Sequence, residues 1–162
     1  MSYVFTTLGY VAYWIGRFFS KKEKMMLFNS LSSFFFMISF ILLNSIQGAT
    51  NSILVVLRGL SVNLKDKLNK PMHWLFTIFA CAFIASCIIF WKNMFSACAL
   101  ICMLINLVAN WYFKTQQLRL ATCVASIFYI LFLFSLSNYI GIIFELTIII
   151  SNLASYIKFS KA

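Results

Sequence analysis

The chain has 162 residues, of which 63% are hydrophobic and 10% are charged, and its formal net charge is +10. Soluble domains carry about 25% charged and under about 50% apolar residues, so this composition excludes a water-soluble globule. Only a bilayer can accommodate so much apolar surface. The composition therefore predicts an all-α protein with several transmembrane helices.

The positive charge by itself would be compatible with nucleic-acid binding, but the basic residues lie in short polar breaks between apolar blocks. That placement is typical of cytoplasmic loops that contact anionic lipid headgroups. No nucleic-acid-binding motif accompanies the charge. We therefore expect the lipid bilayer as partner and no nucleic acid.

Seven stretches are long and apolar enough to approach the roughly 20 residues that a spanning helix needs. They lie near residues 3–19, 25–43, 47–63, 72–90, 94–113, 119–136 and 139–157. No basic residue precedes the first stretch, and Arg17 and three lysines follow it, which is the reverse of a signal peptide's charge order. The first stretch is thus predicted to be a true span with its N-terminus outside.

Charge placement supports the count of seven. With the N-terminus outside, the cytoplasmic side holds Arg17, Lys21, Lys22, Lys24, Lys65, Lys67, Lys70, Lys114, Arg119, Lys158 and Lys161. Lys92 is the single loop residue among the basic ones that falls outside, so the sorting agrees with the positive-inside rule. Seven spans then place the C-terminus in the cytoplasm. The third span is the least regular because it contains Arg58.

A shift of 93 residues lays the first three stretches over the last three without a gap. Five identities result: Lys21 with Lys114, Ser33 with Ser126, Phe35 with Phe128, Leu43 with Leu136, and Gly48 with Gly141. One helix separates the halves, so both have the same orientation and the repeat is parallel. The predicted organisation is a three-helix bundle in 1–64, a spacer loop and linker helix in 65–93, and a second bundle in 94–162.

This 3+1+3 plan resembles the SWEET, PQ-loop and PnuC group of small transporters. The chain is more similar to the bacterial inner-membrane YgjV family, through GATNSILVVLR at 48–58 and the block 119–159. The residues of that block in the family's order are Arg119, Gly141, Glu145, Asn152 and Lys158. The resemblance implies a multi-pass protein of the bacterial inner membrane. The chain departs from the SWEET group in having Pro71 as its single proline, so the prolines that act as hinges there are missing.

The resemblance to the SWEET group implies a transporter or facilitator for a small polar solute, with the site between the two bundles. The alternative is a non-transporting membrane protein, such as a receptor, assembly factor or lipid-interacting subunit, whose intramembrane polar residues are structural. A homo-oligomer is compatible with so short a chain.

Four polar residues on the third and seventh spans are the candidate substrate-binding residues: Asn51, Arg58, Glu145 and Asn152. A carboxylate about 10 Å inside the last helix is costly unless it is protonated, paired or hydrated, so Glu145 is either a solute or proton-coupling group or a structural hydrogen-bonding group. Asn152 lies two turns along the same helix, and Asn51 and Arg58 have the same spacing on the third span. Arg58 either pairs with Glu145 or extends toward the cytoplasm.

The sequence contains no nucleophile elbow, phosphate-binding glycine loop or dinucleotide fingerprint, so no catalytic residue and no cofactor is predicted. The five cysteines form no CxxC pair and none lies near the single histidine, so no metal site is predicted either.

Overall fold

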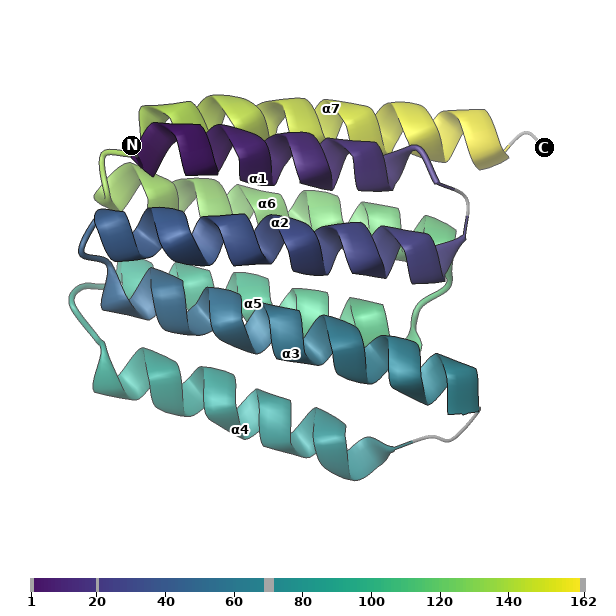
Figure 1. The fold of residues 1–162 in the computed structure, drawn as a ribbon, viewed down its shortest axis with the longest axis horizontal. Helices are drawn as coiled ribbons and strands as arrows, with labels where there is room; N and C mark the ends of the chain where they lie inside the picture. The colour runs from purple at the N-terminus through teal and green to yellow at the C-terminus, as the bar shows by residue number, and fades with distance from the viewer. Residues whose placement is uncertain (1, 20, 69–71, 161–162) are drawn as a thin grey trace. The chain divides into compact units, whose positions relative to one another are not determined.

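The computed structural model describes residues 2–19, 21–68 and 72–160, without the side chains of residues 17, 159 and 160. Every regular element in these residues is an α-helix. The helices are α1 (Ser2–Arg17), α2 (Lys22–Leu42), α3 (Ile46–Leu68), α4 (His73–Ile89), α5 (Phe95–Tyr112), α6 (Thr115–Ser135) and α7 (Tyr139–Ser160) (Figure 1). The prediction of an all-α protein is confirmed. Pro71 and the predicted loop residues at 69–70 lie outside the described residues.

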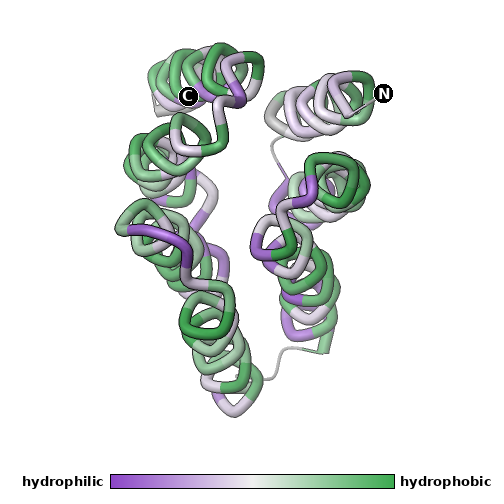
Figure 2. The backbone as a smooth tube through the Cα atoms, turned by 90° about the vertical axis from the view of Figure 1, so that its left-hand side faces the viewer, coloured by the Kyte–Doolittle hydropathy of each residue, from purple (hydrophilic) through white to green (hydrophobic). Residues whose placement is uncertain are grey.

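Four of these helices, namely α2, α5, α6 and α7, are long and apolar enough to cross a membrane. Helix α4 is apolar but has 17 residues, and α1 has 16. Helix α3 has 23 residues but carries many polar side chains. Figure 2 shows the hydropathy of each residue along the chain, and hydrophobic residues predominate in the helices.

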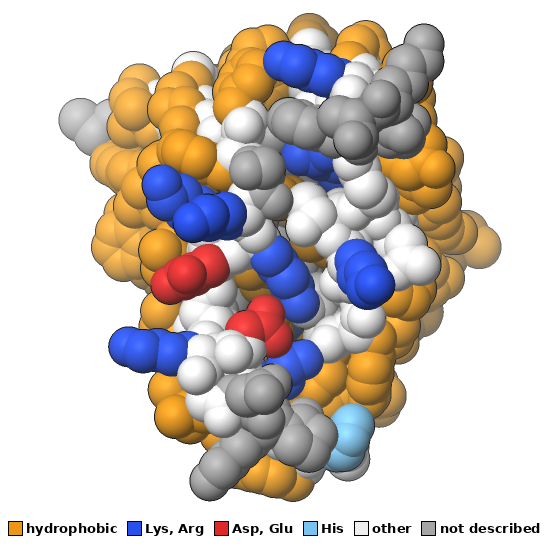
Figure 3. All heavy atoms as spheres, turned by 90° about the vertical axis from the view of Figure 1, so that its right-hand side faces the viewer, with side chains coloured by type: hydrophobic (Ala, Val, Ile, Leu, Met, Phe, Trp, Pro, Cys, Tyr) orange, Lys and Arg blue, Asp and Glu red, His pale blue; other side chains and the backbone are white. Residues whose placement is uncertain are grey.

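Many large apolar side chains lie on the surface, and several polar ones are buried. Ile88, Ile89 and Ile150 are more than 60% exposed, whereas Asn152, Arg58 and Ser32 are buried. An exposed apolar surface of this extent matches a lipid environment. Figure 3 looks onto one end of the helices, where basic side chains and a few acidic ones stand among other polar atoms, and hydrophobic side chains flank them.

The chain divides into two compact units, Met1–Phe90 and Trp91–Ala162. In the first unit α2 packs against both α1 and α3, and α4 packs against α3. In the second unit α6 packs against both α5 and α7. In each unit, the helices pack against their neighbours in the chain.

In the first unit, α1 meets α2 at a buried hydroxyl pair and an aromatic pair. Thr6 Oγ1 and Ser39 Oγ are 2.6 Å apart, and the rings of Tyr10 and Phe36 meet edge to face at 4.7 Å. A polar contact of this kind ties helices together where lipid offers no hydrogen bonds.

The α2–α3 turn is short and closed by hydrogen bonds. Asn44 adopts the left-handed conformation with φ 53°, which asparagine tolerates better than most residues. The backbone N–H of Ser45 donates to Phe40 O at 2.9 Å, and Ser45 Oγ accepts a weak hydrogen bond from the N–H of Gly48 at 3.4 Å. Ser45 therefore caps the N-terminus of α3.

The α6–α7 turn has the same construction. Ser137 has φ 52°, and the N–H of Asn138 donates to Leu133 O at 3.1 Å. Asn138 Oδ1 accepts a hydrogen bond from the N–H of Gly141 at 3.0 Å, which caps α7.

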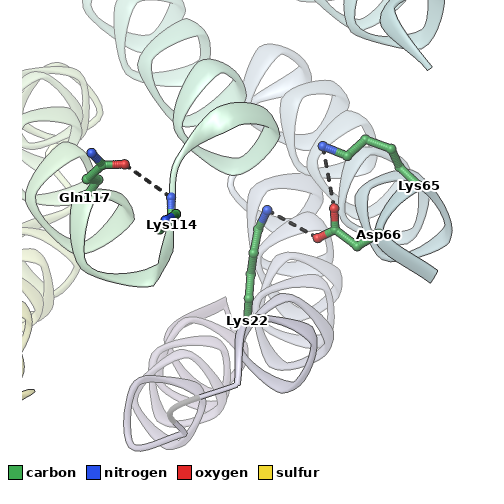
Figure 4. Close-up of polar contacts among 5 residues, drawn as sticks. All are labelled: Lys22, Lys65, Asp66, Lys114 and Gln117. Atoms are coloured by element: carbon green, nitrogen blue, oxygen red, sulfur yellow. Dashed lines mark hydrogen bonds and ion pairs between the residues drawn. The ribbon is translucent and has the colours of Figure 1, made fainter. Parts of the chain in front are cut away.

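Two predicted boundaries are wrong. The break predicted from Lys65 begins later, because α3 continues to Leu68. Asp66 there pairs with Lys22 of α2 at 3.2 Å and with Lys65 at 3.5 Å (Figure 4), and basic residues in a last turn also complement the helix dipole.

Helix α6 begins at Thr115, four residues before the start predicted at Arg119. The N–H of Lys114 donates to Gln117 Oε1 at 3.3 Å and closes the start of the helix (Figure 4). This polar first turn precedes the apolar part of α6, which is why an apolar window places the start too late.

Candidate functional site

Asn51 and Arg58 lie on α3 in the first unit, two turns apart, and are 5% and 2% exposed. Asn51 Oδ1 accepts a hydrogen bond of 3.1 Å from Ser86 Oγ of α4. The sequence analysis did not predict Ser86, since a single serine in an apolar stretch gives no signal. Asn51 therefore links α3 to α4.

Glu145 and Asn152 lie on α7 in the second unit, and both are buried. Glu145 of α7 interacts electrostatically with Tyr129 of α6. Within α5, Asn106 Nδ2 donates to Cys102 O at 3.1 Å.

The side chain of Asn152 has no accessible surface, and neither its Oδ1 nor its Nδ2 has a hydrogen-bond partner. An amide buried without partners costs about 1–3 kcal/mol, and buried polar groups are nearly always paired. Asn152 therefore stands out among the four predicted residues.

Arg119 is a buried polar residue that the site prediction did not include. It is 1% exposed, and its Nη1 donates to Gln116 Oε1 at 3.2 Å and to Ser155 O of α7 at 3.3 Å. The 93-residue shift gives a signal that could have singled out Arg119. Its equivalent in the first half is the apolar Met26, so Arg119 is a charged residue where the other half has an apolar one.

The contacts between α6 and α7 define which face of α7 is turned toward α6. Cys123 Sγ lies 3.8 Å from Ile149 O, and Arg119 Nη1 bonds Ser155 O. Asn152 is three residues from Ile149 and from Ser155, so its position on the helix lies between them on this face. Asn152 thus lies on the face of α7 that meets Arg119 and Cys123 of α6.

The four predicted residues therefore form two pairs. Asn51 and Arg58 share α3 in the first unit, and Glu145 and Asn152 share α7 in the second. A pocket of about 330 Å³ at the α2–α3 turn contains none of the four residues; its lining is Ile41, Asn44, Ser45, Ile46, Ala49, Thr50 and Ile53. In the described part of the chain, no three His, Cys, Asp or Glu side chains are grouped as a metal site would need.

Comparison with known proteins identifies the family of the chain. No curated protein and no solved structure matches the chain. The family Imp-YgjV, described as bacterial inner membrane protein, matches residues 1–162. The match to the whole chain, together with the apolar helices and their exposed apolar side chains, shows that the chain is an inner-membrane protein belonging to the Imp-YgjV family.

Proposed function

We propose that this protein carries a small polar solute across the inner membrane, along a path lined by polar residues of α3 and α7. The residues are Asn51, Arg58, Glu145 and Asn152. The observation that supports this proposal most directly is the buried Asn152 amide, whose two polar atoms have no partner in the protein. A solute that hydrogen-bonds this amide would remove the cost of its burial.

The internal repeat forms part of the proposal. Under the 93-residue shift the bounds of α2, Lys22–Leu42, fall on those of α6, Thr115–Ser135. The first residue of α3 likewise falls on that of α7. Helix starts that coincide twice at one shift support descent of both halves from one three-helix unit.

The turns give independent support for the same shift. The left-handed residues Asn44 and Ser137 coincide, and so do the capping residues Ser45 and Asn138. Backbone conformation is not biased by composition as sequence identities are, so this agreement is stronger support than the five identities.

The proposed topology is seven spans in a 3+1+3 plan, with the N-terminus outside, the C-terminus cytoplasmic and the solute site between the bundles, as in the SWEET group. Lys22 and Lys65 at one end of the first unit, joined by Asp66, support a cytoplasmic end there. Helices α1, α3 and α4 would cross with the help of their packing partners.

A second candidate function has an observation in its favour. The hydrogen bond between Ser86 and Asn51 shows that at least one of the four residues joins two helices. A non-transporting protein would use all four in this way, as interhelical contacts worth about 0.6 kcal/mol each.

Cysteine accessibility separates the two functions. In a variant without the five native cysteines, single cysteines replace Asn51, Glu145 or Asn152, and membrane vesicles of both orientations receive a charged, membrane-impermeant thiol reagent. A carrier predicts reaction at all three positions from at least one side, and the reaction should slow when solute is present.

The controls use neighbouring positions. A cysteine at Ile150, 66% exposed on α7, should face lipid and stay unreactive, and one at the fully buried Ala125 of α6 should also stay unreactive. If Asn51, Glu145 and Asn152 behave like Ala125 from both sides, the carrier function is wrong.

A further inference from the structure

The pocket at the α2–α3 turn, which we call the turn pocket, is built by one hairpin. Ile41 of α2 and four residues of α3 line it together with the turn residues Asn44 and Ser45. All of them belong to the first unit. Its volume of about 330 Å³ lies within the range of sites that hold small ligands.

The apolar part of the turn pocket lies at the surface of the hairpin. Ile41, Ile46 and Ile53 are large apolar side chains that are exposed. Because the chain is an inner-membrane protein, exposed apolar side chains of its helices face lipid acyl chains rather than water. A hollow left empty deprives its lining of dispersion contacts, and an acyl chain is the surrounding group that restores them.

The turn provides the polar end of the pocket. Asn44 is exposed and Thr50 is half-buried, whereas Ser45 Oγ already accepts the N–H of Gly48. An amide N–H₂ and a hydroxyl can donate hydrogen bonds to ester carbonyl oxygens. At 1.5 Å per residue, Thr50 lies about 6 Å and Ile53 about 10 Å from the first residue of α3. The pocket therefore extends from a polar turn into an apolar part of the hairpin, as a phospholipid does from ester to chain.

The lining of the turn pocket contains no charged side chain. Lys22 begins α2 and Lys65 lies in the last turn of α3, so both lysines are at the other end of the hairpin. A lipid in this pocket is therefore recognised by its chain and ester groups rather than by the charge of its headgroup. In the proposed topology, this end of the hairpin lies in the outer leaflet.

The α6–α7 hairpin has larger side chains at the equivalent positions. Under the 93-residue shift, Ala49 and Thr50 fall on Ile142 and Ile143. The two turns are built alike, so the isoleucines leave less room beside the second turn. The small side chains at positions 49 and 50 thus distinguish the first hairpin.

We propose that the turn pocket binds one acyl chain of a diacyl phospholipid, whose ester carbonyl groups accept hydrogen bonds from Asn44 and Thr50. The lipid is a bound component of the α2–α3 hairpin and not the carried solute. This inference goes beyond the proposed function and does not depend on it.

Photolabelling tests the site without a transport assay. The full-length protein in a neutral detergent receives phosphatidylethanolamine that carries a photoactivatable diazirine on one acyl chain, and mass spectrometry locates the label after illumination. Labelling of residues 41–53 should saturate with lipid concentration. Unlabelled phosphatidylethanolamine and phosphatidylglycerol should displace it equally. Labelling around Ile150, an exposed apolar residue of α7, should rise without saturation.

Variants that fill the pocket locate the effect. Ala49→Ile and Thr50→Ile introduce the side chains of the second hairpin, and each should raise the half-saturating lipid concentration by about 5-fold or more. Thr50 is half-buried, so Thr50→Ile serves if Ala49→Ile does not fold.

The matched control is Thr7→Ile, which makes the same change at an exposed residue of α1. The Thr7 hydroxyl bonds to Tyr3 O within its own helix, so this variant should change the half-saturating concentration by less than about 2-fold.

Four results would overturn the inference. Labelling of residues 41–53 that rises without saturation would show ordinary contact with surrounding lipid. Absence of label there would show that protein, such as a second copy of the chain, covers the pocket. Displacement by phosphatidylglycerol alone would show recognition of headgroup charge. Saturable labelling that is unchanged in both Ala49→Ile and Thr50→Ile would place the lipid elsewhere.

Discussion

The α2–α3 and α6–α7 hairpins are built alike and differ in chemistry at one place. Both turn through a left-handed residue and cap the second helix with a side-chain oxygen. At equivalent positions on the second helix, Gly59 touches α2 closely, whereas Asn152 contributes a buried amide to the contact with α6.

At this place the first hairpin is closely packed, whereas the second buries a polar side chain. Small residues at a helix contact let backbones approach and gain dispersion energy, which is the main source of association in lipid. A buried amide without a hydrogen-bond partner gives up part of that gain. The Asn152 position therefore costs the second hairpin stability that the first does not lose at Gly59.

The strongest test of this comparison places the residue of the second hairpin in the first. Gly59→Asn should lower the free energy of unfolding by about 2–3 kcal/mol, because its Cβ would collide with Ser30 Oγ in a packed contact. Unfolding in mixed detergent–dodecyl sulfate micelles measures the change. Adding Ser30→Ala should recover part of the loss, since the next atom, Ser30 Cβ, would lie at an ordinary 3.5 Å. Unchanged stability of the single variant would contradict the close approach.

The second test removes the unpartnered amide. Asn152→Leu should raise the free energy of unfolding by about 1–2 kcal/mol, because an apolar side chain of similar size avoids the desolvation cost. Asn110→Leu is the matched control: Asn110 is also buried, but its Nδ2 already donates to Asn106 O, so stability should fall. A loss of stability in Asn152→Leu would indicate a structural hydrogen bond.

A third test concerns Asn51 in the first unit. Ser86→Ala removes the hydroxyl that donates to Asn51 Oδ1 and should cost about 1 kcal/mol in the same unfolding assay. Ser61→Ala, which loses only an exposed hydroxyl bonded within α3, should stay within about 0.5 kcal/mol of the wild type. Equal effects would show that the bond to α4 contributes nothing specific.

The smallest effect is expected at the basic end of the first unit. Asp66→Asn breaks the pairs with Lys22 and Lys65, and partly exposed ion pairs contribute less than about 1 kcal/mol. The difference from wild type should shrink further between about 0.05 and 0.5 M salt, because the Debye length falls. A difference that persists at high salt would indicate a packing role for Asp66 beyond its charge.

The fold was more predictable from the sequence than the site. All seven helices lie where apolar stretches and polar breaks place them, since length and hydropathy determine spans locally. The boundary errors near Lys65 and Arg119 arose because polar residues in the last turn of α3 and the first turn of α6 were left out of the apolar stretches. Ser155, the α7 partner of Arg119, is 36 residues away, and no local pattern reveals such a contact.

The candidate residues on α3 and α7 were identifiable because polar groups in apolar stretches are few. Their surroundings were not: the partner of Asn51 is a serine on another helix, and the lack of a partner for Asn152 depends on packing. Such three-dimensional relations require coordinates.

The short α2–α3 turn has a consequence for biogenesis. Helix α3 contains a buried arginine and several polar residues and does not qualify as a span by itself, whereas α2 does. Because the turn is closed by local hydrogen bonds and α2 packs directly against α3, the two helices can enter the membrane together as a hairpin. We expect α3 to insert poorly when it is synthesised without α2, and lengthening the turn with a flexible linker should reduce the yield of inserted protein.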